Sequence, residues 1–149
     1  MTIALQIRIA DITDADGLAQ LARLNSLFNG ASDSAVQIAA RLANPRRVET
    51  PILAEIDRHI IGFASLRIVP CIFFADPYAE LTELYIEEGF RRQGVGRALV
   101  AHAEALAREA SARSMLILTD FYNHPAQSLY RSMGYWHYDI ALKKDLYEK

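Results

Sequence analysis

The chain has 149 residues, a formal net charge of −2 and a sequence pI of about 6.1, so no global field draws it onto nucleic acid or an anionic membrane. Its single cysteine, Cys71, excludes an internal disulfide framework and a cysteine-based zinc cage, and fits a reducing cytoplasm. No apolar run approaches the roughly 18 residues of a membrane span, and the amino terminus lacks signal-peptide features. We expect one domain over residues 1–149, located in the cytoplasm.

The first third of the chain predicts a strand followed by two helices. Residues 3–10 alternate loosely between apolar and polar side chains, as in an edge or half-buried strand. Residues 15–28 carry apolar side chains at helical spacing, and Asn29-Gly30 is a stop signal. A second, short helix is expected from near Ser32 or Asp33 to the Asn44-Pro45 break.

From residue 47 the pattern changes to strands. Residues 48–56 and 59–69 are rich in β-branched and aliphatic side chains and flank a hairpin-like turn, which predicts two antiparallel strands. The remaining predicted elements follow in chain order: an apolar loop over 70–78, a strand over 79–86, an amphipathic helix over about 94–110, a strand over 115–119 parallel to its predecessor, a short helix over 126–133, and one or two strands over 135–146. The sum is an α/β domain.

The stretch FRRQGVGRALV, residues 90–100, lies between a predicted strand and a predicted helix. The first N–H groups of a helix lack partners, and the helix dipole adds positive charge there. Gly94 and Gly96 let an anion approach the backbone, and the neighbouring arginines add formal charge. Two glycines in a first turn cost helix stability, roughly 1 kcal/mol each, so a plain helix start explains the pattern less well than a phosphate site.

The spacing of the glycines limits which class of phosphate ligand the turn could bind. Gly89 and Gly94 are spaced like the first glycines of an NTP-binding P-loop, but Val95-Gly96 stand where that motif needs Lys and Ser or Thr. A dinucleotide fingerprint beginning at Gly94 would need a third glycine where this chain has Leu99, and the turn is long for that fold. The P-loop is excluded, and the dinucleotide site stays as an alternative.

The motif Arg91-x-x-Gly94-x-Gly96 resembles that of the GNAT superfamily of acetyl-coenzyme A-dependent N-acetyltransferases. A second segment, Asn123-x-x-Ala126-x-x-Leu129-Tyr130-x-x-x-Gly134-Tyr135, is similar to the later signature of the same family. The two segments follow each other in the family's order. The resemblance implies a single GNAT-like α/β (α+β) domain with a mixed, mainly antiparallel sheet of about six to seven strands, splayed parallel strands in its middle, and about four helices.

The resemblance also implies acetyl-CoA as co-substrate and a set of residues that bind it. The pyrophosphate would lie on the loop and helix start, and the pantetheine arm would bond to the strand over 79–86 like an added strand. The implied coenzyme-binding residues are Tyr85, Ile86, Arg91, Arg92, Gln93, Gly94, Val95, Gly96, Arg97, Asn123 and Tyr130. Asn123 could equally cap a helix. The four histidines show no metal-ligand spacing, and we expect no metal.

Catalytic roles follow from the same resemblance. The backbone N–H of Leu84 could stabilise the oxyanion that forms at the thioester. Glu83 is the first candidate base for the attacking amine and Glu80 the second, although both could be solvent-facing or contact the substrate's charge. Strict alternation puts these carboxylates on opposite faces, and a bulge would change that. Tyr130 stands where the family has a tyrosine that protonates the departing thiolate, or it is a core tyrosine.

The acceptor is expected to be a primary amine of a small molecule or peptide, attacked directly in a ternary complex. Acidic Glu80 and Glu83 favour a cationic amine. The other candidate acceptor-binding residues are Phe28, Asn29, Phe73 and Tyr78, of which the loop aromatics could instead cover the core. The competing hypothesis is a catalytically weak acyl-CoA-binding sensor or partner module. Nucleic-acid and membrane partners are not expected, and a homodimer is left open.

Overall fold

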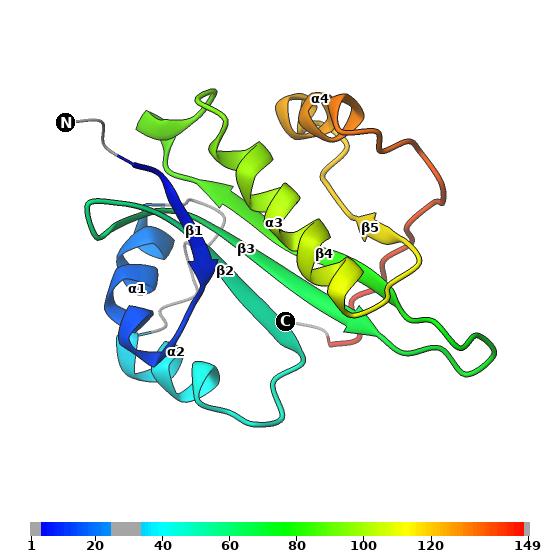
Figure 1. Ribbon diagram of the computed structural model, residues 1–149, viewed down its shortest axis with the longest axis horizontal. Helices are drawn as coiled ribbons and strands as arrows, with labels where there is room; N and C mark the ends of the chain where they lie inside the picture. Colours follow the sequence, from blue (N-terminus) through cyan, green and yellow to red (C-terminus); the bar gives the residue numbers. More distant parts are fainter. Residues whose placement is uncertain (1–3, 25–33, 148–149) are drawn as a thin grey trace. The chain divides into compact units, whose positions relative to one another are not determined.

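The computed structural model describes residues 4–24 and 34–147 and divides the chain into two compact units, Met1–Ile117 and Leu118–Lys149. The first unit holds a five-stranded sheet in the order β1-β2-β3-β4-β5 (Figure 1). Its strands are β1 Gln6–Ile9, β2 Glu49–Ile56, β3 His59–Val69, β4 Tyr78–Ile86 and β5 Met115–Ile117. Neighbours from β1 to β4 pair antiparallel, whereas β4 and β5 pair parallel.

Four α-helices occur in the described residues: α1 Ala15–Arg23, α2 Ala35–Leu42, α3 Val95–Glu109 and α4 His124–Ser132. The short 3-10 helices η1 Ile12–Asp14 and η3 Glu88–Phe90 precede α1 and α3. Ser34 and Gln37 form a capping box at α2, and Asn123 caps α4 by accepting a hydrogen bond from the Ala126 N–H. These side chains satisfy helix donors that would otherwise lack partners.

Helices cover both faces of the sheet (Figure 1). On one face α3 packs closely on β3, where a Cβ at Gly62 would come within 3.1 Å of Leu99. On the other face Phe63 and Tyr85, which are cross-strand partners on β3 and β4, pack against the buried cluster that includes Leu18 and Leu21 of α1. The sheet is therefore buried from two sides, as a strand-rich apolar sequence requires.

A β-bulge interrupts the pairing of β3 with β4. Ser65 pairs with Glu83 and Leu66 with Leu81, so Thr82 is the extra residue of β4. A bulge reverses the in-and-out alternation of the side chains that follow it. Before the bulge the even-numbered side chains of β4 therefore point to the face of Arg67, and after it the odd-numbered side chains do.

The fold-class prediction is confirmed, but the predicted number of strands is too high. Residues 135–147 form no strand in the structure, although Trp136, Tyr138 and Ile140 alternate with more polar residues. These three side chains are exposed. Alternation reports the preference of a segment for extended backbone, whereas a strand also needs a hydrogen-bonded ladder with a neighbour, which this segment does not form.

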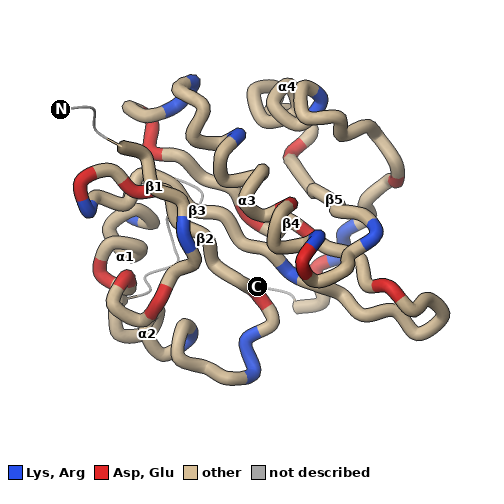
Figure 2. The backbone as a smooth tube through the Cα atoms, viewed as in Figure 1, with Lys and Arg blue, Asp and Glu red and all other residues tan. Residues whose placement is uncertain are grey.

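The helix and strand limits otherwise follow the sequence pattern within a few residues. The predicted helix over 15–28 ends in the described residues at Arg23, and its predicted remainder, with Phe28 and Asn29, lies outside them. Lys and Arg positions are interspersed with Asp and Glu positions along the described chain (Figure 2). No described helix combines the length and the apolar content that a membrane-spanning segment needs.

Candidate functional site

The loop between β4 and α3 has the backbone of an anion-binding turn. Gly94, the N-cap residue of α3, has φ 85° and ψ 0°, and Arg92 also has a positive φ of 60°. Two left-handed residues separated by one that is not left-handed turn successive N–H groups toward one side of the chain. Gly94 has no side chain with which to cap the start of α3. The conformation, and not only the absence of a side chain, explains glycine at position 94.

Two side chains of this loop are held by carbonyl oxygens of the chain just before them. The Arg91 Nε donates a hydrogen bond of 2.9 Å to the Ile86 carbonyl, and its guanidinium lies 5.7 Å from the centre of the Tyr85 ring. Gln93 Nε2 donates to the Gly89 carbonyl at 3.0 Å. Val95 buries its side chain in the core, so only its main chain is available to a ligand. The loop is therefore fixed to the end of β4.

The parallel ladder between β4 and the edge strand β5 is short, so the predicted position of these two strands in the middle of the sheet is not found in the described residues. Their parallel pairing joins Ala79 with Met115, Glu80 with Leu116 and Leu81 with Ile117, and ends there. Strand β4 continues to Ile86 and remains paired with β3 over that length. The predicted oxyanion donor, Leu84, and the predicted coenzyme-binding residues Tyr85 and Ile86 all lie beyond the end of the parallel ladder.

The bulge at Thr82 brings the two candidate bases onto one face of the sheet. Cross-strand partners point to the same side, and Glu80 pairs with Arg67 while Glu83 pairs with Ser65. Positions 65 and 67 of β3 share a face by simple alternation. Glu80 and Glu83 therefore share the face of Phe63 and Tyr85, on the side of α1.

The two carboxylates have different surroundings. Glu80 accepts hydrogen bonds from Arg67 Nε, at 3.0 Å, and from Arg67 Nη2. Within the described part of the chain Glu83 forms no ion pair, and burial raises its pKa, with a further contribution from the negative charge of Glu49. The residue is nevertheless exposed to solvent, so water can reach a proton that it takes up. The surroundings of Glu83 therefore favour proton uptake, whereas the Glu80 carboxylate is engaged by Arg67.

Glu49 is a residue that the sequence analysis missed. It begins β2, pairs with Arg67 across the sheet, and accepts a 2.6 Å hydrogen bond from the Thr82 hydroxyl. Its only sequence signal is a carboxylate at the start of an apolar predicted strand. That signal does not indicate a site, because solvent-facing residues at strand ends give the same pattern.

Asn123 immediately precedes α4 and Tyr130 lies on it, both in the second unit. Asn123 acts as the helix cap, which is one of its two predicted roles. Tyr130 is only 8% exposed, and its ring packs edge-on against Tyr135 with 6.1 Å between the ring centres. Burial raises the pKa of the Tyr130 phenol, so the group holds its proton at neutral pH.

The candidate acceptor-binding residues are spread over the loop and β4. Tyr78 is the first residue of β4 and is half-buried. Phe73 is 91% exposed, which rules out the alternative that it covers the core. Phe74 is also exposed and lies under the Arg113 guanidinium, 3.9 Å from its ring centre. Phe28 and Asn29 lie outside the described residues.

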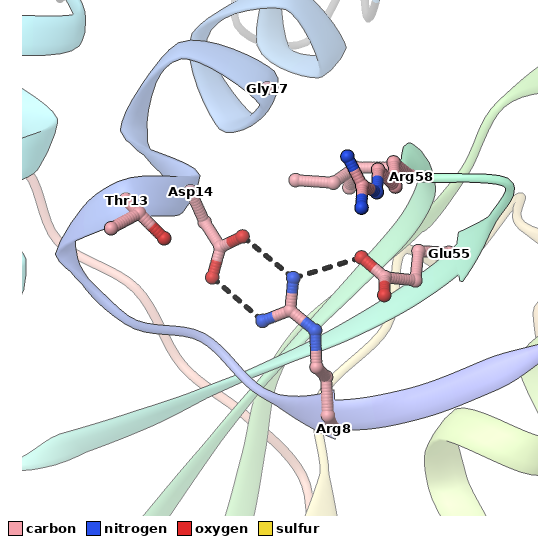
Figure 3. Close-up of a pocket in the computed structure, with 7 residues that line it drawn as sticks. Arg8, Thr13, Asp14, Gly17, Glu55 and Arg58 are labelled. Atoms are coloured by element: carbon pink, nitrogen blue, oxygen red, sulfur yellow. Dashed lines mark hydrogen bonds and ion pairs between the residues drawn. The ribbon is translucent and has the colours of Figure 1, made fainter.

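A pocket of about 420 Å³ lies elsewhere in the first unit (Figure 3). Arg8 on β1 reaches both carboxylate oxygens of Asp14, at 2.8 and 2.7 Å, and also Glu55 of β2 at 2.8 Å. These hydrogen bonds hold the pKa of the buried Asp14 carboxyl below its usual value. None of the predicted site residues lines this pocket. Arg8, Asp14 and Glu55 pair with one another here, so we assign this part of the pocket to the junction between β1 and α1.

The described residues contain no group of three or more side chains of the kinds that hold a metal ion. The described part of the candidate site consists of the loop before α3, the part of β4 beyond its ladder with β5, and the carboxylates of Glu49, Glu80 and Glu83. Such an arrangement can hold an anion at one end and accept a proton at the other.

Comparison with known proteins identifies the family. The model of the acetyltransferase (GNAT) family matches residues 19–135. A Bacillus subtilis protein provisionally named ribosomal protein bS18-alanine N-acetyltransferase is 31% identical over 56% of this chain and 51% of its own length. The D-amino-acid N-acetyltransferase HPA3 of Saccharomyces cerevisiae is 31% identical over 58% of this chain and 54% of its own. The chain thus matches about half the length of each relative.

Solved structures agree on the fold. The aminoglycoside N-acetyltransferase AAC(6')-Iy, solved in complex with CoA, superposes with a TM-score of 0.79 at 18% identity, covering 97% of this chain and 96% of that one. The family match over residues 19–135 confirms the resemblance inferred from the motifs around Gly94 and Tyr130. The chain belongs to the GNAT family of acetyltransferases.

Proposed function

We propose that this protein transfers the acetyl group of acetyl-CoA to a primary amine of a small molecule or peptide, by direct attack in a ternary complex. The observation that supports the proposal is the path of β4, in a chain that belongs to an acetyltransferase family. Its parallel ladder with β5 ends at Leu81, and the strand then continues to Ile86 and leads to the start of α3, where the N-cap residue Gly94 has no side chain. A ligand with a pyrophosphate at one end and amides along its arm suits this path.

The residues at the start of α3 fit a diphosphate. The left-handed Gly94 exposes the main-chain amides, and the guanidinium groups of Arg91 and Arg92 add positive charge on an exposed loop. When bound, acetyl-CoA supplies a thioester carbonyl as the electrophile. We assign to Gln93, Val95, Gly96 and Arg97 main-chain or side-chain contacts with the same anion, and to Tyr85 and Ile86 main-chain contacts with the arm.

The proposed catalytic steps use three residues. Glu83 takes a proton from the amine as its nitrogen forms a bond to the acetyl carbon. The Leu84 N–H stabilises the negative charge on the carbonyl oxygen. Tyr130 donates its phenolic proton to the sulfur as the carbon–sulfur bond breaks, and no covalent enzyme intermediate is needed.

The face of β4 suggests the charge of the acceptor. Arg67 offsets Glu80, whereas Glu49 and Glu83 leave an excess of negative charge on this face. A cationic amine is therefore favoured over an acidic one. The names of the two relatives give acceptors of different size, alanine of a ribosomal protein and a D-amino acid, so peptides and small molecules both belong in the proposal.

The direct test is an acceptor screen with acetyl-CoA that reports free thiol. The amines are spermidine, kanamycin, D-amino acids and a peptide with amino-terminal alanine, and mass spectrometry identifies the acetylated product. We expect thiol release that depends on one class of amine, with cationic amines preferred. Tight coenzyme A binding without transfer to any of these amines would instead favour the acyl-CoA-binding module.

Replacement of Gly94 by valine is expected to weaken coenzyme A binding by about tenfold or more. A valine in the left-handed conformation of residue 94 would cost roughly 1–3 kcal/mol. We therefore expect the turn to change its conformation, so that the main-chain amides at the start of α3 lose their arrangement. A Cβ at position 94 meets no atom within 4 Å, so the effect does not come from a clash within the protein. Isothermal calorimetry measures the affinity.

Gly94→Asn is the matched control for this prediction, because asparagine tolerates the left-handed conformation better than valine does. We expect it to keep more of the affinity. Equal affinities for wild type and Gly94→Val would remove the pyrophosphate from this loop.

A further inference from the structure

The Glu49 side chain on β2 reaches β4, the strand of the candidate base, across one intervening strand. It starts β2, whereas Glu83 lies on β4, and β3 separates the two strands. The carboxylate of Glu49 nevertheless contacts β4, because its Oε1 accepts a 2.6 Å hydrogen bond from the hydroxyl of Thr82, the residue next to Glu83. A long side chain at the end of β2 is therefore anchored beside the bulge.

Thr82 has one hydroxyl proton and two acceptors within reach. Its Oγ1 lies 2.6 Å from Glu49 Oε1 and 3.3 Å from the Ser65 carbonyl oxygen. A hydroxyl donates one hydrogen bond, and bonds to a charged acceptor are shorter and stronger. The proton is thus directed to Glu49. The extra residue of the bulge has a specific use, since it holds a second carboxylate in place.

We propose that Glu49 is a positioning residue for acetyl transfer: Thr82 holds its carboxylate beside Glu83, where its negative charge favours proton uptake by Glu83. The inference rests on the proposed function, in which Glu83 accepts the proton of the amine. It is consistent with the direction in which Glu49 shifts the pKa of Glu83. Glu49 itself needs no contact with either substrate.

Other titratable residues belong to the elements of this face. They are Arg67, Glu80, Tyr78 and Tyr85 on the strands, Asp16 and Arg23 on α1, and Arg41 on α2. Arg67 and Glu80 pair with each other. Among the charges of the described chain, Glu49 is the one that raises the pKa of Glu83. Removal of the Glu49 charge should therefore lower the pKa of Glu83.

The test is a comparison of wild type with Glu49→Gln by two readouts. The first is ¹³C NMR titration of the side-chain carboxyls in protein labelled at glutamate, without ligand, with the Glu83 signal assigned from Glu83→Gln. The second is the pH dependence of kcat with the best amine of the acceptor screen. We expect Glu49→Gln to move both the Glu83 titration and the acid limb of kcat to lower pH.

Three further variants separate this role from a structural one. Glu49→Asp keeps the charge and Thr82→Ser keeps the hydroxyl, so both should stay close to wild type in both readouts. Thr82→Val removes the anchor and should shift both in the same direction as Glu49→Gln. Glu109→Gln, at the exposed end of α3, makes the same change in net charge and should leave the titration of Glu83 unmoved.

The two readouts distinguish failure of this inference from failure of the proposed function. An unmoved Glu83 titration in Glu49→Gln overturns the inference, even where Glu83→Gln abolishes turnover and the proposed base stands. A shifted titration with an unmoved acid limb shows that the coupling exists but that Glu83 is not the base. That result overturns both the proposed role of Glu83 and the role of Glu49 in catalysis.

Discussion

Glu83→Gln is expected to lower kcat by about a hundredfold, the lower end of the range for loss of a general base. Glutamine matches the shape of glutamate but cannot take a proton from the amine. Binding of acetyl-CoA should be unchanged, since the side chain of Glu83 faces the side of α1 and the proposed contacts of β4 with the coenzyme are main chain. Steady-state thiol release and calorimetry measure the two quantities.

The raised pKa of Glu83 predicts how kcat should depend on pH. Burial and Glu49 raise the pKa of Glu83, so the acid limb of kcat should lie above the pH at which an ordinary glutamate titrates. The charged form is the base, and activity is therefore lost as the pH falls through this raised pKa. Glu83→Gln should abolish the limb, whereas Glu80→Gln should keep it, because the Glu80 carboxylate is engaged by Arg67 and is not the proposed base. A wild-type rate and profile in Glu83→Gln would exclude this base.

Tyr130→Phe is also expected to lower kcat by about a hundredfold, with coenzyme A affinity unchanged. Phenylalanine keeps the ring that packs on Tyr135 and removes only the hydroxyl. Burial raises the pKa of Tyr130, so the proton needed by the leaving thiolate is present at neutral pH and is lost only in strongly alkaline solution. Stopped-flow detection of the thiol measures the step.

The control for Tyr130→Phe is Tyr138→Phe, which removes a hydroxyl from an exposed tyrosine of the same unit and should leave kcat unchanged. Full activity of Tyr130→Phe would show that Tyr130 is not the acid and only packs in the core. Equal losses in both variants would point to a general effect of tyrosine replacement on the second unit.

The features that the sequence predicts well are local ones. The helix start at Gly94 depends on adjacent residues, because a glycine and an uncapped first turn are recognisable within one short stretch. The strand over 79–86 and the helix after it were predicted within one residue at each end. The strands expected over 135–146 are wrong because a strand is completed by a partner elsewhere in the chain.

The arrangement of the carboxylates could not be predicted for a related reason. The phase of Glu80 and Glu83 depends on one extra residue, Thr82, and nothing in the sequence of β4 marks it as a bulge. The pairing of Glu80 with Arg67 and the reach of Glu49 to Thr82 join residues separated by 13 and 33 positions. Such contacts follow from register, which the fold sets as a whole.

The bulge in β4 adds a residue to this strand without changing its pairing on either side. Thr82 lies between Leu81, which pairs with Leu66, and Glu83, which pairs with Ser65. Loss of Thr82 would therefore leave both pairs and the faces of both side chains in place and make the ladder regular, but it would remove the hydroxyl that contacts Glu49. A homologue shortened by this one residue should keep the sheet and the orientation of the position equivalent to Glu83, while the carboxylate at the start of β2 loses its anchor.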